Sequence, residues 1–378
     1  MRIVIAAPAH PYRGGIAEFS NRIALQFQSE GHDITVVTFS LQYPHFLFPG
    51  KTQYTDSPPP ENLRITRKLN SVNPVNWLIN GTRLKRQKPD ILLLRFWLPF
   101  MGPCLGTIAR IARSNGHTKV ICIFDNVVPH EKRPGDRLLT KYLTGSVDGA
   151  IVMSATVKEE LEVFRSDMPI KFSPHPLFDN YGESVPRDFA ISSLKLDPKY
   201  SYLLFFGFIR AYKGLDLLID AFGDQRLRNR NLRLIIAGEF YEDDKPYREL
   251  IIKNGLEDEV IVFNSFIRDG EVPLFFAAAD IIVQPYRSAT QSGVAQIAFQ
   301  YEKPMLVTDV GGLKEIIADG KCGYVVKPDP QSIADSIVDF YDNNRKYRFI
   351  DGVKEEKQKF TWDKMTSAIF DVYKHVIS

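Results

Sequence analysis

The chain has 378 residues, of which 44% are hydrophobic and 25% charged, and its formal net charge is +3. The length predicts two domains, at roughly 100–200 residues each, and the composition excludes a disordered or fibrous chain. The apolar runs fall far short of the roughly 18 residues that span a bilayer, and the three cysteines are too scattered to imply a disulfide framework or a zinc cluster. Residues 1–9 fit a strand rather than a signal peptide. We therefore expect a cytoplasmic protein.

The charge is unevenly distributed along the chain. Residues 1–182 carry 22 basic and 15 acidic side chains, whereas residues 183–378 carry 26 and 30. A basic half indicates an anionic surface or substrate on that side, although drift in solvated surface charge would produce the same difference. No basic run or aromatic platform of a nucleic-acid-binding module occurs, so we do not expect nucleic acid as a partner.

Short β-branched runs alternate with amphipathic segments from end to end. In the first half, strands are predicted over 2–7, 33–39, 90–94, 119–124 and 149–153. In the second half, they are predicted over 201–206, 232–237, 260–263, 281–283 and 304–308. Between them, Leu215, Leu218 and Phe222 show the spacing of a helix packed on a sheet. The sequence thus predicts an α/β protein with buried parallel sheets, which bind ligands at the carboxyl ends of their strands.

The strand pattern and the helix pattern both break around residues 181–198, where glycine, serine and proline cluster. We therefore place a first domain at 1–182, a linker at 183–199 and a second domain at 200–358. The remaining segment, 359–378, has one apolar face and is expected to form a terminal helix.

Glycines recur at the predicted strand-to-helix junctions of both halves. They are Gly14, Gly15, Gly207, Gly311 and Gly312. A helix N-terminus offers N–H groups and a positive dipole end, and glycine lets a phosphate approach the backbone. One junction also supplies the cations Arg210 and Lys213, which suit a diphosphate. Any single glycine is more often a simple turn, but the recurrence favours anion binding.

Residues 207–215, which read GFIRAYKGL, resemble the glycine–arginine–leucine…lysine–glycine signature of the retaining glycosyltransferases of family 4. Further likenesses follow in order along nearly the whole chain. They are 14–19 (GGIAEF), 31–37 (GHDITVV), 148–154 (DGAIVMS), 310–317 (VGGLKEII) and 323–326 (GYVV).

The resemblance implies the GT-B fold, in which two Rossmann-like domains face each other across a cleft and the last helix crosses back onto the first domain. The first domain would bind the acceptor and the second the nucleotide-sugar. By position, Lys213 would contact the donor diphosphate, and Arg210 would join it, although the family's arginine position is Phe208 here. Gly15 would lie near the donor phosphates. The other donor-binding residues carried over are Gly14, Gly207, Gly311, Gly312 and Glu315.

The chain departs from the family pattern at the paired glutamates, whose positions are Ala289 and Ile297 here. Residues 288–293 read SATQSG instead. We expect this loop to bind the donor through hydroxyl, amide and N–H donors. The residues concerned are Thr290, Gln291, Ser292 and Gly293. The alternative is that the loop only caps a helix in a catalytically impaired protein.

A second departure lies after the strand at 119–124. Many family members place a histidine near the acceptor hydroxyl there, whereas this chain has Asp125, with His130 five residues later. Either side chain could orient or deprotonate the acceptor, and we expect both to be catalytic without assigning the base.

The sequence therefore indicates retaining transfer of a sugar from a nucleotide diphosphate sugar to a glycan or lipid-linked glycan, in bacterial surface polysaccharide synthesis. No cofactor and no metal are expected, because cations already face the diphosphate. Three alternatives stay open: a GT-B epimerase or phosphorylase, a non-catalytic nucleotide-sugar-binding partner, and a dinucleotide oxidoreductase. The last is weakest, because residues 13–18 lack the three spaced glycines of that fingerprint.

The basic residues Arg83, Lys85, Arg86 and Lys88, followed by the aromatic stretch 95–100, could meet an anionic membrane or a lipid pyrophosphate. Equally, the basic residues could be a solvated helix end and the aromatics a buried edge. Peripheral contact with the inner membrane is therefore an expectation for the cytoplasmic protein.

Overall fold

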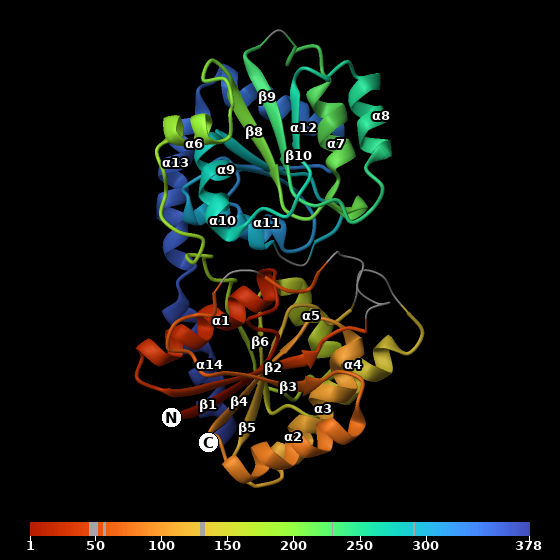
Figure 1. Ribbon diagram of the computed structural model, residues 1–378, viewed down its shortest axis with the longest axis vertical. Coiled ribbons are helices and arrows are strands. Elements are labelled where there is room, and N and C mark those ends of the chain that lie inside the picture. Colours follow the sequence, from red (N-terminus) through yellow and green to blue (C-terminus); the bar gives the residue numbers. More distant parts are fainter. Residues whose placement is uncertain (45–51, 56–57, 129–132, 229, 290–291) are drawn as a thin grey trace. The chain divides into compact units, whose positions relative to one another are not determined.

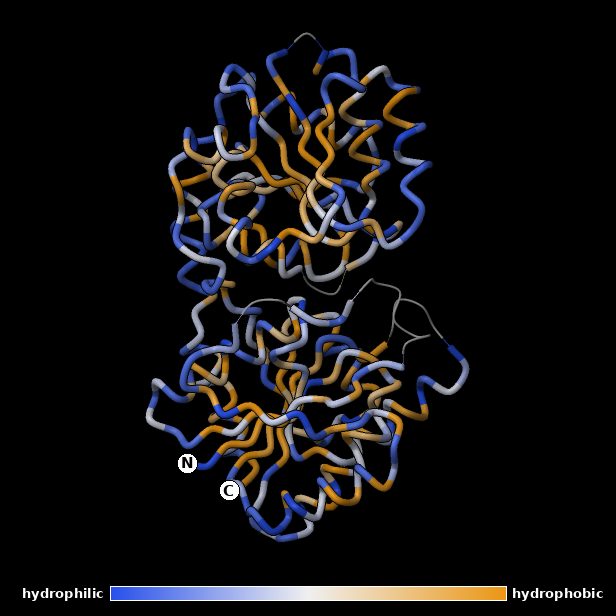
Figure 2. Tube along the Cα trace, in the orientation of Figure 1, coloured by the Kyte–Doolittle hydropathy of each residue, from blue (hydrophilic) through white to orange (hydrophobic). Residues whose placement is uncertain are grey.

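The computed structural model describes residues 1–44, 52–55, 58–128, 133–228, 230–289 and 292–378. It divides into two compact units, one made of Met1–His175 with Thr361–Ser378 and the other of Pro176–Phe360. Each unit is a parallel sheet with helices packed on it (Figure 1). The most hydrophobic segments are the strands in the middle of each unit (Figure 2).

The described part of the first unit has a seven-stranded sheet in the order β3-β2-β1-β4-β5-β6-β7. Its strands are β1 (Arg2–Ala6), β2 (Asp33–Leu41), β3 (Ile65–Asn70), β4 (Ile91–Phe96), β5 (Lys119–Phe124), β6 (Gly149–Val152) and β7 (Ile170–Phe172). All of them pair in parallel, and Val4 of β1 lies between Thr35 of β2 and Leu92 of β4. Every residue of β4 is buried, as expected for a central parallel strand covered on both faces.

The helices of the first unit are α1 (Gly15–Ser29), α2 (Pro74–Gln87), α3 (Gly102–Arg113), α4 (Asp136–Thr144), α5 (Ala155–Phe164) and α14 (Trp362–Ile377). The terminal helix α14 belongs to this unit, and both chain ends lie there (Figure 1). It packs against α1, where Phe370 meets Phe27 with ring centroids 5.5 Å apart. The Thr366 hydroxyl also donates to Glu30 at 2.7 Å.

The described part of the second unit has a six-stranded parallel sheet in the order β10-β9-β8-β11-β12-β13. Its strands are β8 (Ser201–Phe206), β9 (Leu232–Ala237), β10 (Val260–Phe263), β11 (Ile281–Gln284), β12 (Met305–Thr308) and β13 (Gly323–Val326). Its helices are α6 (Arg187–Ser193), α7 (Leu215–Phe222), α8 (Lys245–Lys253), α9 (Val272–Ala278), α10 (Gly293–Gln300), α11 (Leu313–Ile316), α12 (Pro330–Asp342) and α13 (Arg345–Glu356). Residues 183–199, expected to link the domains, are part of this unit, and α6 packs on α9.

The predicted α/β class is confirmed, and each strand predicted from the sequence is present within a few residues. Three strands were not predicted. The edge strands β3 and β7 are short and partly exposed, so they lack the continuous apolar run of a buried strand. The strand β13 has only four residues and begins with glycine.

In both sheets the strand order reverses once beside the first strand of the unit. The reversal lies between β1 and β4 in the first sheet and between β8 and β11 in the second. Ligands of doubly wound sheets bind at the carboxyl ends of the strands at such a switch point. The loops after β1, β4, β8 and β11 are therefore the places to look for a site.

Candidate active site

Most of the predicted donor-binding residues of the second unit follow β8 and β11, the two strands at the switch point. Gly207 comes directly after β8 and has φ +99°, a left-handed conformation that favours glycine. A Cβ at this position would lie 3.4 Å from the Lys213 amine and 3.4 Å from Val294 in the first turn of α10. Gly207 is thus the point where the cation and the start of α10 come together.

Lys213 is a buried cation, with 8% of its surface exposed. Its pKa is lowered, first because burial penalises the charged form and second because Arg210 is nearby. Its amine lies 5.4 Å from the ring centroid of Tyr286. Among the residues that the structure describes, no carboxylate pairs with it. A buried ammonium without a carboxylate is costly, so this position is suited to an anion that arrives with a ligand.

Arg210 supplies a second, half-buried cation in the same loop. Its guanidinium carbon lies 4.9 Å from the ring centroid of Tyr241, which holds the side chain by a cation–π contact. The loop is fixed to the end of β11 by a backbone hydrogen bond of 2.7 Å from the Arg287 N–H to the Tyr212 carbonyl. The loops after β8 and β11 therefore form one local structure.

The N-terminus of α10 is held by a buried serine. The Ser292 hydroxyl accepts from the Ala295 N–H at 3.3 Å and donates to the Gln284 side-chain oxygen at 2.6 Å. Gln284 is 1% exposed, and its amide nitrogen has no hydrogen-bond partner among the described residues. A Cβ at Gly293 would lie 2.9 Å from Phe178, so little more than glycine fits there. Ser292 therefore acts as a helix cap, which leaves the N–H groups of the first turn as the donors for a ligand.

Two of the four residues predicted in this loop, Thr290 and Gln291, lie outside the described residues. The buried amide of Gln284 was not predicted to belong to the site. The only signal for it in the sequence is a glutamine at the end of an otherwise apolar strand. For Gln296, the corresponding signal is a glutamine among the apolar residues of α10. The Gln296 side chain is fully buried, and neither of its polar atoms is hydrogen-bonded to any residue that the structure describes.

The glycines after β12 have a packing role. Gly311 has φ +45°, and a Cβ there would lie 1.7 Å from the Ala289 carbonyl oxygen. The Gly312 N–H donates to the same oxygen at 3.2 Å. This pair therefore holds the loop that follows β11, and the Gly312 N–H is already used. Glu315, also predicted to bind the donor, is exposed on the short helix α11.

In the first unit, the predicted glycines lie at the start of α1, directly after the loop that follows β1. Gly14 has φ +97° and nothing within 4 Å of a Cβ placed on it, so backbone conformation rather than packing requires glycine there. Gly15 is the exposed first residue of α1. The 15-residue helix presents its N-terminal N–H groups at the carboxyl edge of the sheet, as an anion or sugar site requires.

Asp125 lies directly after β5, and both of its carboxylate oxygens face Arg95. The Arg95 side chain donates to them at 2.7 and 2.8 Å, and both side chains are about 95% buried. The guanidinium also lies 3.9 Å from the ring centroid of Phe19 in α1 and 3.4 Å from the Ile16 carbonyl. The pair thus joins β4, β5 and the start of α1. His130, the other predicted catalytic residue, lies outside the described residues.

One interpretation of the sequence placed the aromatic stretch 95–100 against a membrane. In the structure this stretch lies mostly inside the protein. Phe96 is fully buried, Trp97 is 8% exposed, and Phe100 packs against the same core. Arg95 is held inside by Asp125. The alternative interpretation of a buried edge is therefore confirmed for these residues, because their side chains complete the core under α3.

Within the described ranges, no helix is both long and apolar enough to cross a bilayer. In the same part of the chain, no group of three or more histidine, cysteine, aspartate or glutamate side chains is arranged to hold a metal ion.

Comparison with known proteins agrees with this geometry. Residues 186–355, nearly the whole second unit, match the family model of the glycosyl transferases group 1. The match is to the unit that contains Gly207, Arg210 and Lys213. The chain is also 26% identical, over 82% of its length and 83% of the relative's, to an uncharacterized glycosyltransferase of Methanocaldococcus jannaschii.

Solved structures show the fold of the whole chain. A sucrose-phosphate synthase from Thermosynechococcus elongatus has a TM-score of 0.76 at 15% identity, covering 100% of this chain and 99% of that one. HepE of Anabaena, solved in complex with UDP, has a TM-score of 0.74 at 16% identity, covering 99% and 100%. The chain thus has the GT-B fold, as the sequence motifs predicted.

Proposed function

We propose that the protein is a retaining glycosyltransferase that moves a sugar from a nucleotide diphosphate sugar to a hydroxyl group of a glycan or lipid-linked glycan. We place this reaction in the cytoplasm, in the synthesis of a bacterial surface polysaccharide. The observation that carries the proposal is the buried amine of Lys213. It has no carboxylate partner among the described residues and meets the first turn of α10 at Gly207. That combination fits a diphosphate.

Departure of the nucleotide diphosphate builds negative charge on the leaving oxygen. Lys213, Arg210 and the N–H groups at the start of α10 are fixed before the reaction, so they would stabilise this charge without reorganising. Because the leaving phosphate can also accept the proton of the incoming hydroxyl, attack on the same face of the sugar would retain its configuration. HepE, a structural neighbour, has been solved with UDP and with UDP-glucose, which makes uridine nucleotides the first donors to test.

We propose that Lys213 and Arg210 take the place of a metal ion at the diphosphate. The expected result is that transfer continues at an unchanged rate in excess EDTA. A rate that falls with EDTA and returns with magnesium would contradict the proposal. No further cofactor is proposed.

On the acceptor side, we propose different roles for the two predicted catalytic residues. Asp125 is a positioning residue, because both of its oxygens hold Arg95, and Arg95 in turn contacts the start of α1. His130 follows the same strand in the sequence and is proposed to contact and orient the acceptor hydroxyl, whose proton passes to the leaving phosphate. Replacing His130 by Gln should lower kcat and leave donor binding unchanged.

The direct test begins with thermal shifts in UDP-, GDP-, ADP- and dTDP-sugars, followed by nucleotide release with the stabilising donor and candidate acceptor glycans. NMR of the product would show whether the anomeric configuration is retained. Lys213→Ala should lower kcat/KM by about 100-fold or more, as expected for an electrostatic donor. The matched control is Lys245→Ala, because Lys245 is an exposed lysine paired with Glu249 on α8.

The result would also separate the alternatives. Full transfer by Lys213→Ala would overturn the donor assignment. Donor binding without any release of nucleotide would indicate a non-catalytic binding partner. Turnover of the nucleotide-sugar in the absence of an acceptor hydroxyl would indicate an epimerase or phosphorylase.

A further inference from the structure

The outward face of α2 in the first unit is apolar, contrary to the usual pattern of a surface helix. Val75, Leu78 and Ile79 are 63%, 53% and 62% exposed. The inner face contains Gly81, where a Cβ would lie 2.9 Å from Ile111 of α3, so the two helices already pack closely. The exposure of these apolar side chains is therefore not a consequence of loose packing between α2 and α3.

The same face becomes basic toward the end of the helix. Residues at spacings of three and four lie on one side of a helix, so Arg83 and Arg86 continue the stripe that Leu78 and Ile79 begin. Together with Thr82 and Gln87, these four residues line a groove with a volume of about 570 Å³. Among the described residues, no carboxylate pairs with either arginine.

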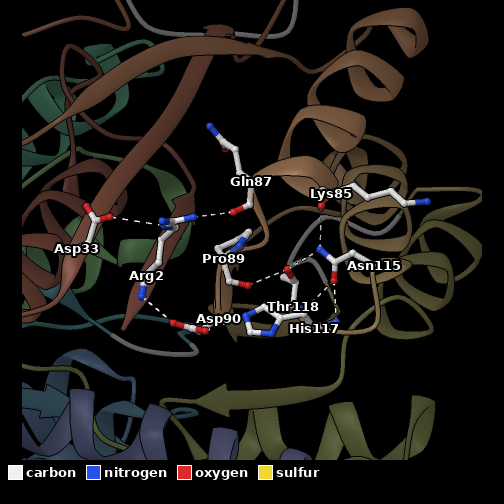
Figure 3. Close-up of polar contacts among 9 residues, drawn as sticks. All are labelled: Arg2, Asp33, Lys85, Gln87, Pro89, Asp90, Asn115, His117 and Thr118. Atoms are coloured by element: carbon white, nitrogen blue, oxygen red, sulfur yellow. Dashed lines mark hydrogen bonds and ion pairs between the residues drawn. The ribbon is translucent and has the colours of Figure 1, made fainter.

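The surroundings of α2 carry almost no negative charge. Residues 62–124 contain eleven basic side chains and a single acidic one, Asp90. That carboxylate is occupied, because it accepts from the Arg2 N–H at 2.8 Å and contacts the His117 ring nitrogen at 2.8 Å (Figure 3). This segment therefore accounts for the positive charge of the first half of the chain.

The helix is also held rigidly at both ends. At its start, the Asn73 side chain accepts from the N–H of Val75 at 3.0 Å. At its end, Arg2 donates to the Gln87 carbonyl at 2.8 Å and Asn115 donates to the Lys85 carbonyl at 3.1 Å (Figure 3). The Lys85 side chain points away from these contacts (Figure 3). The face is therefore formed before anything docks on it, and no ordering of the helix is needed on binding.

We propose that this face of α2 docks onto the surface of a membrane that contains anionic lipids. Val75, Leu78 and Ile79 enter the boundary between headgroups and acyl chains, while Arg83 and Arg86 contact the lipid phosphates. A second copy of the chain is a poor occupant, because an antiparallel twofold contact would set the basic end of each helix against the apolar start of the other. Nucleic acid would leave the apolar side chains without a partner. A bilayer surface satisfies both halves of the face.

The test uses the full chain in flotation with vesicles of phosphatidylcholine, alone or mixed with phosphatidylglycerol. The protein should float only with the anionic vesicles, and less in high salt. Leu78→Ser with Ile79→Ser should weaken binding about tenfold or more. Arg83→Gln with Arg86→Gln should do the same. Circular dichroism would show that both variants remain folded.

The chain offers matched controls for both changes. Val163 is 74% exposed on α5, so Val163→Ser removes an apolar surface side chain elsewhere. Lys245→Gln with Lys253→Gln removes two charges from α8. Neither control should alter vesicle binding. Vesicle binding requires no sugar transfer, so this test stands apart from the test of the proposed function.

A second measurement places the contact on α2 directly. Ile79→Cys labelled with an environment-sensitive fluorophore should shift its emission to the blue with anionic vesicles, whereas labelled Val163→Cys should not. Selective labelling is feasible because the three native cysteines are buried, and burial raises the pKa of the Cys104 thiol to about 12.

Several results would overturn the proposal. They are the absence of flotation at low salt, undiminished binding of the serine variant, an equal loss in the controls, and an unshifted label at position 79. If sedimentation velocity shows that the unaltered protein is a dimer and the serine variant a monomer, the face binds a second copy of the chain instead.

Discussion

The amine of Lys213 lies directly beside Gly207, 3.4 Å from the point where a side chain at that glycine would begin. Gly207 also has φ +99°. An alanine there would therefore strain the backbone, and its methyl group would occupy the space between the amine and the first turn of α10. We expect Gly207→Ala to lower the free energy of unfolding by about 1–3 kcal/mol and to weaken donor binding. Urea unfolding and nucleotide titration measure the two effects.

The control for this substitution is Gly255→Ala. Gly255 has φ +61° but lies after α8, with only Arg228 near a Cβ placed on it. The Gly255→Ala variant should lose about as much stability as Gly207→Ala but bind the donor like the unaltered protein. If both variants bind the donor like the unaltered protein, Gly207 has no part in the site.

Lys213 is expected to reduce stability while it supports function. Replacing a buried, unpartnered cation by Met removes the cost of burying its charge, so Lys213→Met should raise the free energy of unfolding by about 0.5–2 kcal/mol. Donor binding should be weakened but still measurable in the same variant. Thermal unfolding with and without nucleotide measures both quantities.

A second lysine, which is partly buried, provides the comparison. The Lys303 amine donates to the Ala279 carbonyl at 3.0 Å and so satisfies the end of α9. Lys303→Met should lower stability and leave donor binding intact. A Lys213→Met variant that is destabilised like Lys303→Met would indicate a structural lysine rather than a binding one.

The sequence predicted the α/β class and the glycines that follow the strands, because apolar runs and glycines at strand ends are local patterns. It could not show what each glycine does. Gly311 and Gly312 hold the Ala289 carbonyl, a contact between segments more than twenty residues apart. Only the folded chain brings these two segments together.

The role of Asp125 was hidden from the sequence for the same reason. Its partner, Arg95, lies 30 residues earlier on a neighbouring strand, and in the sequence that arginine belongs to a basic and aromatic stretch suggestive of a membrane. The exposed apolar face of α2 was also missed. A helix with apolar residues on two sides does not reveal by its pattern which side is covered.

Breaking the Arg95–Asp125 pair should unfold the first unit more readily. Asp125→Asn leaves a buried guanidinium without its charge partner, which costs about 3–5 kcal/mol. The control is Glu162→Gln, which breaks an exposed pair with Lys158 at 3.8 Å and should cost less than about 1 kcal/mol. Urea unfolding measures both. A stable Asp125→Asn protein with no transfer activity would instead identify Asp125 as the general base.

The cap of α10 should matter for binding as well as for stability. Ser292→Ala removes the acceptor for the Ala295 N–H and leaves the Gln284 side chain without its hydroxyl partner. We expect a loss of about 1–2 kcal/mol in stability and weaker donor binding. Asp329→Ala removes a comparable cap from α12 and should affect stability alone. Equal donor affinity in the two variants would contradict a ligand-binding role for the start of α10.

The lowered pKa of Lys213 predicts opposite effects of pH on stability and on donor binding. The unfolded chain holds the Lys213 proton up to a higher pH than the folded chain does. Stability contributed by this residue therefore rises as the pH increases from its folded pKa toward the ordinary value of 10.5. Donor affinity should fall over the same interval, because a neutral amine no longer attracts the diphosphate.

Lys303 also has a lowered pKa, of about 8, through burial, so the raw stability curve contains both lysines. The difference between the unaltered protein and Lys213→Met isolates the Lys213 contribution. That difference should shrink with rising pH, and the alkaline loss of nucleotide affinity should be absent from Lys213→Met. Calorimetric titration should also show uptake of a proton on nucleotide binding at alkaline pH. If nucleotide affinity shows the same alkaline fall in Lys213→Met and no proton is taken up by the unaltered protein, the diphosphate does not meet Lys213.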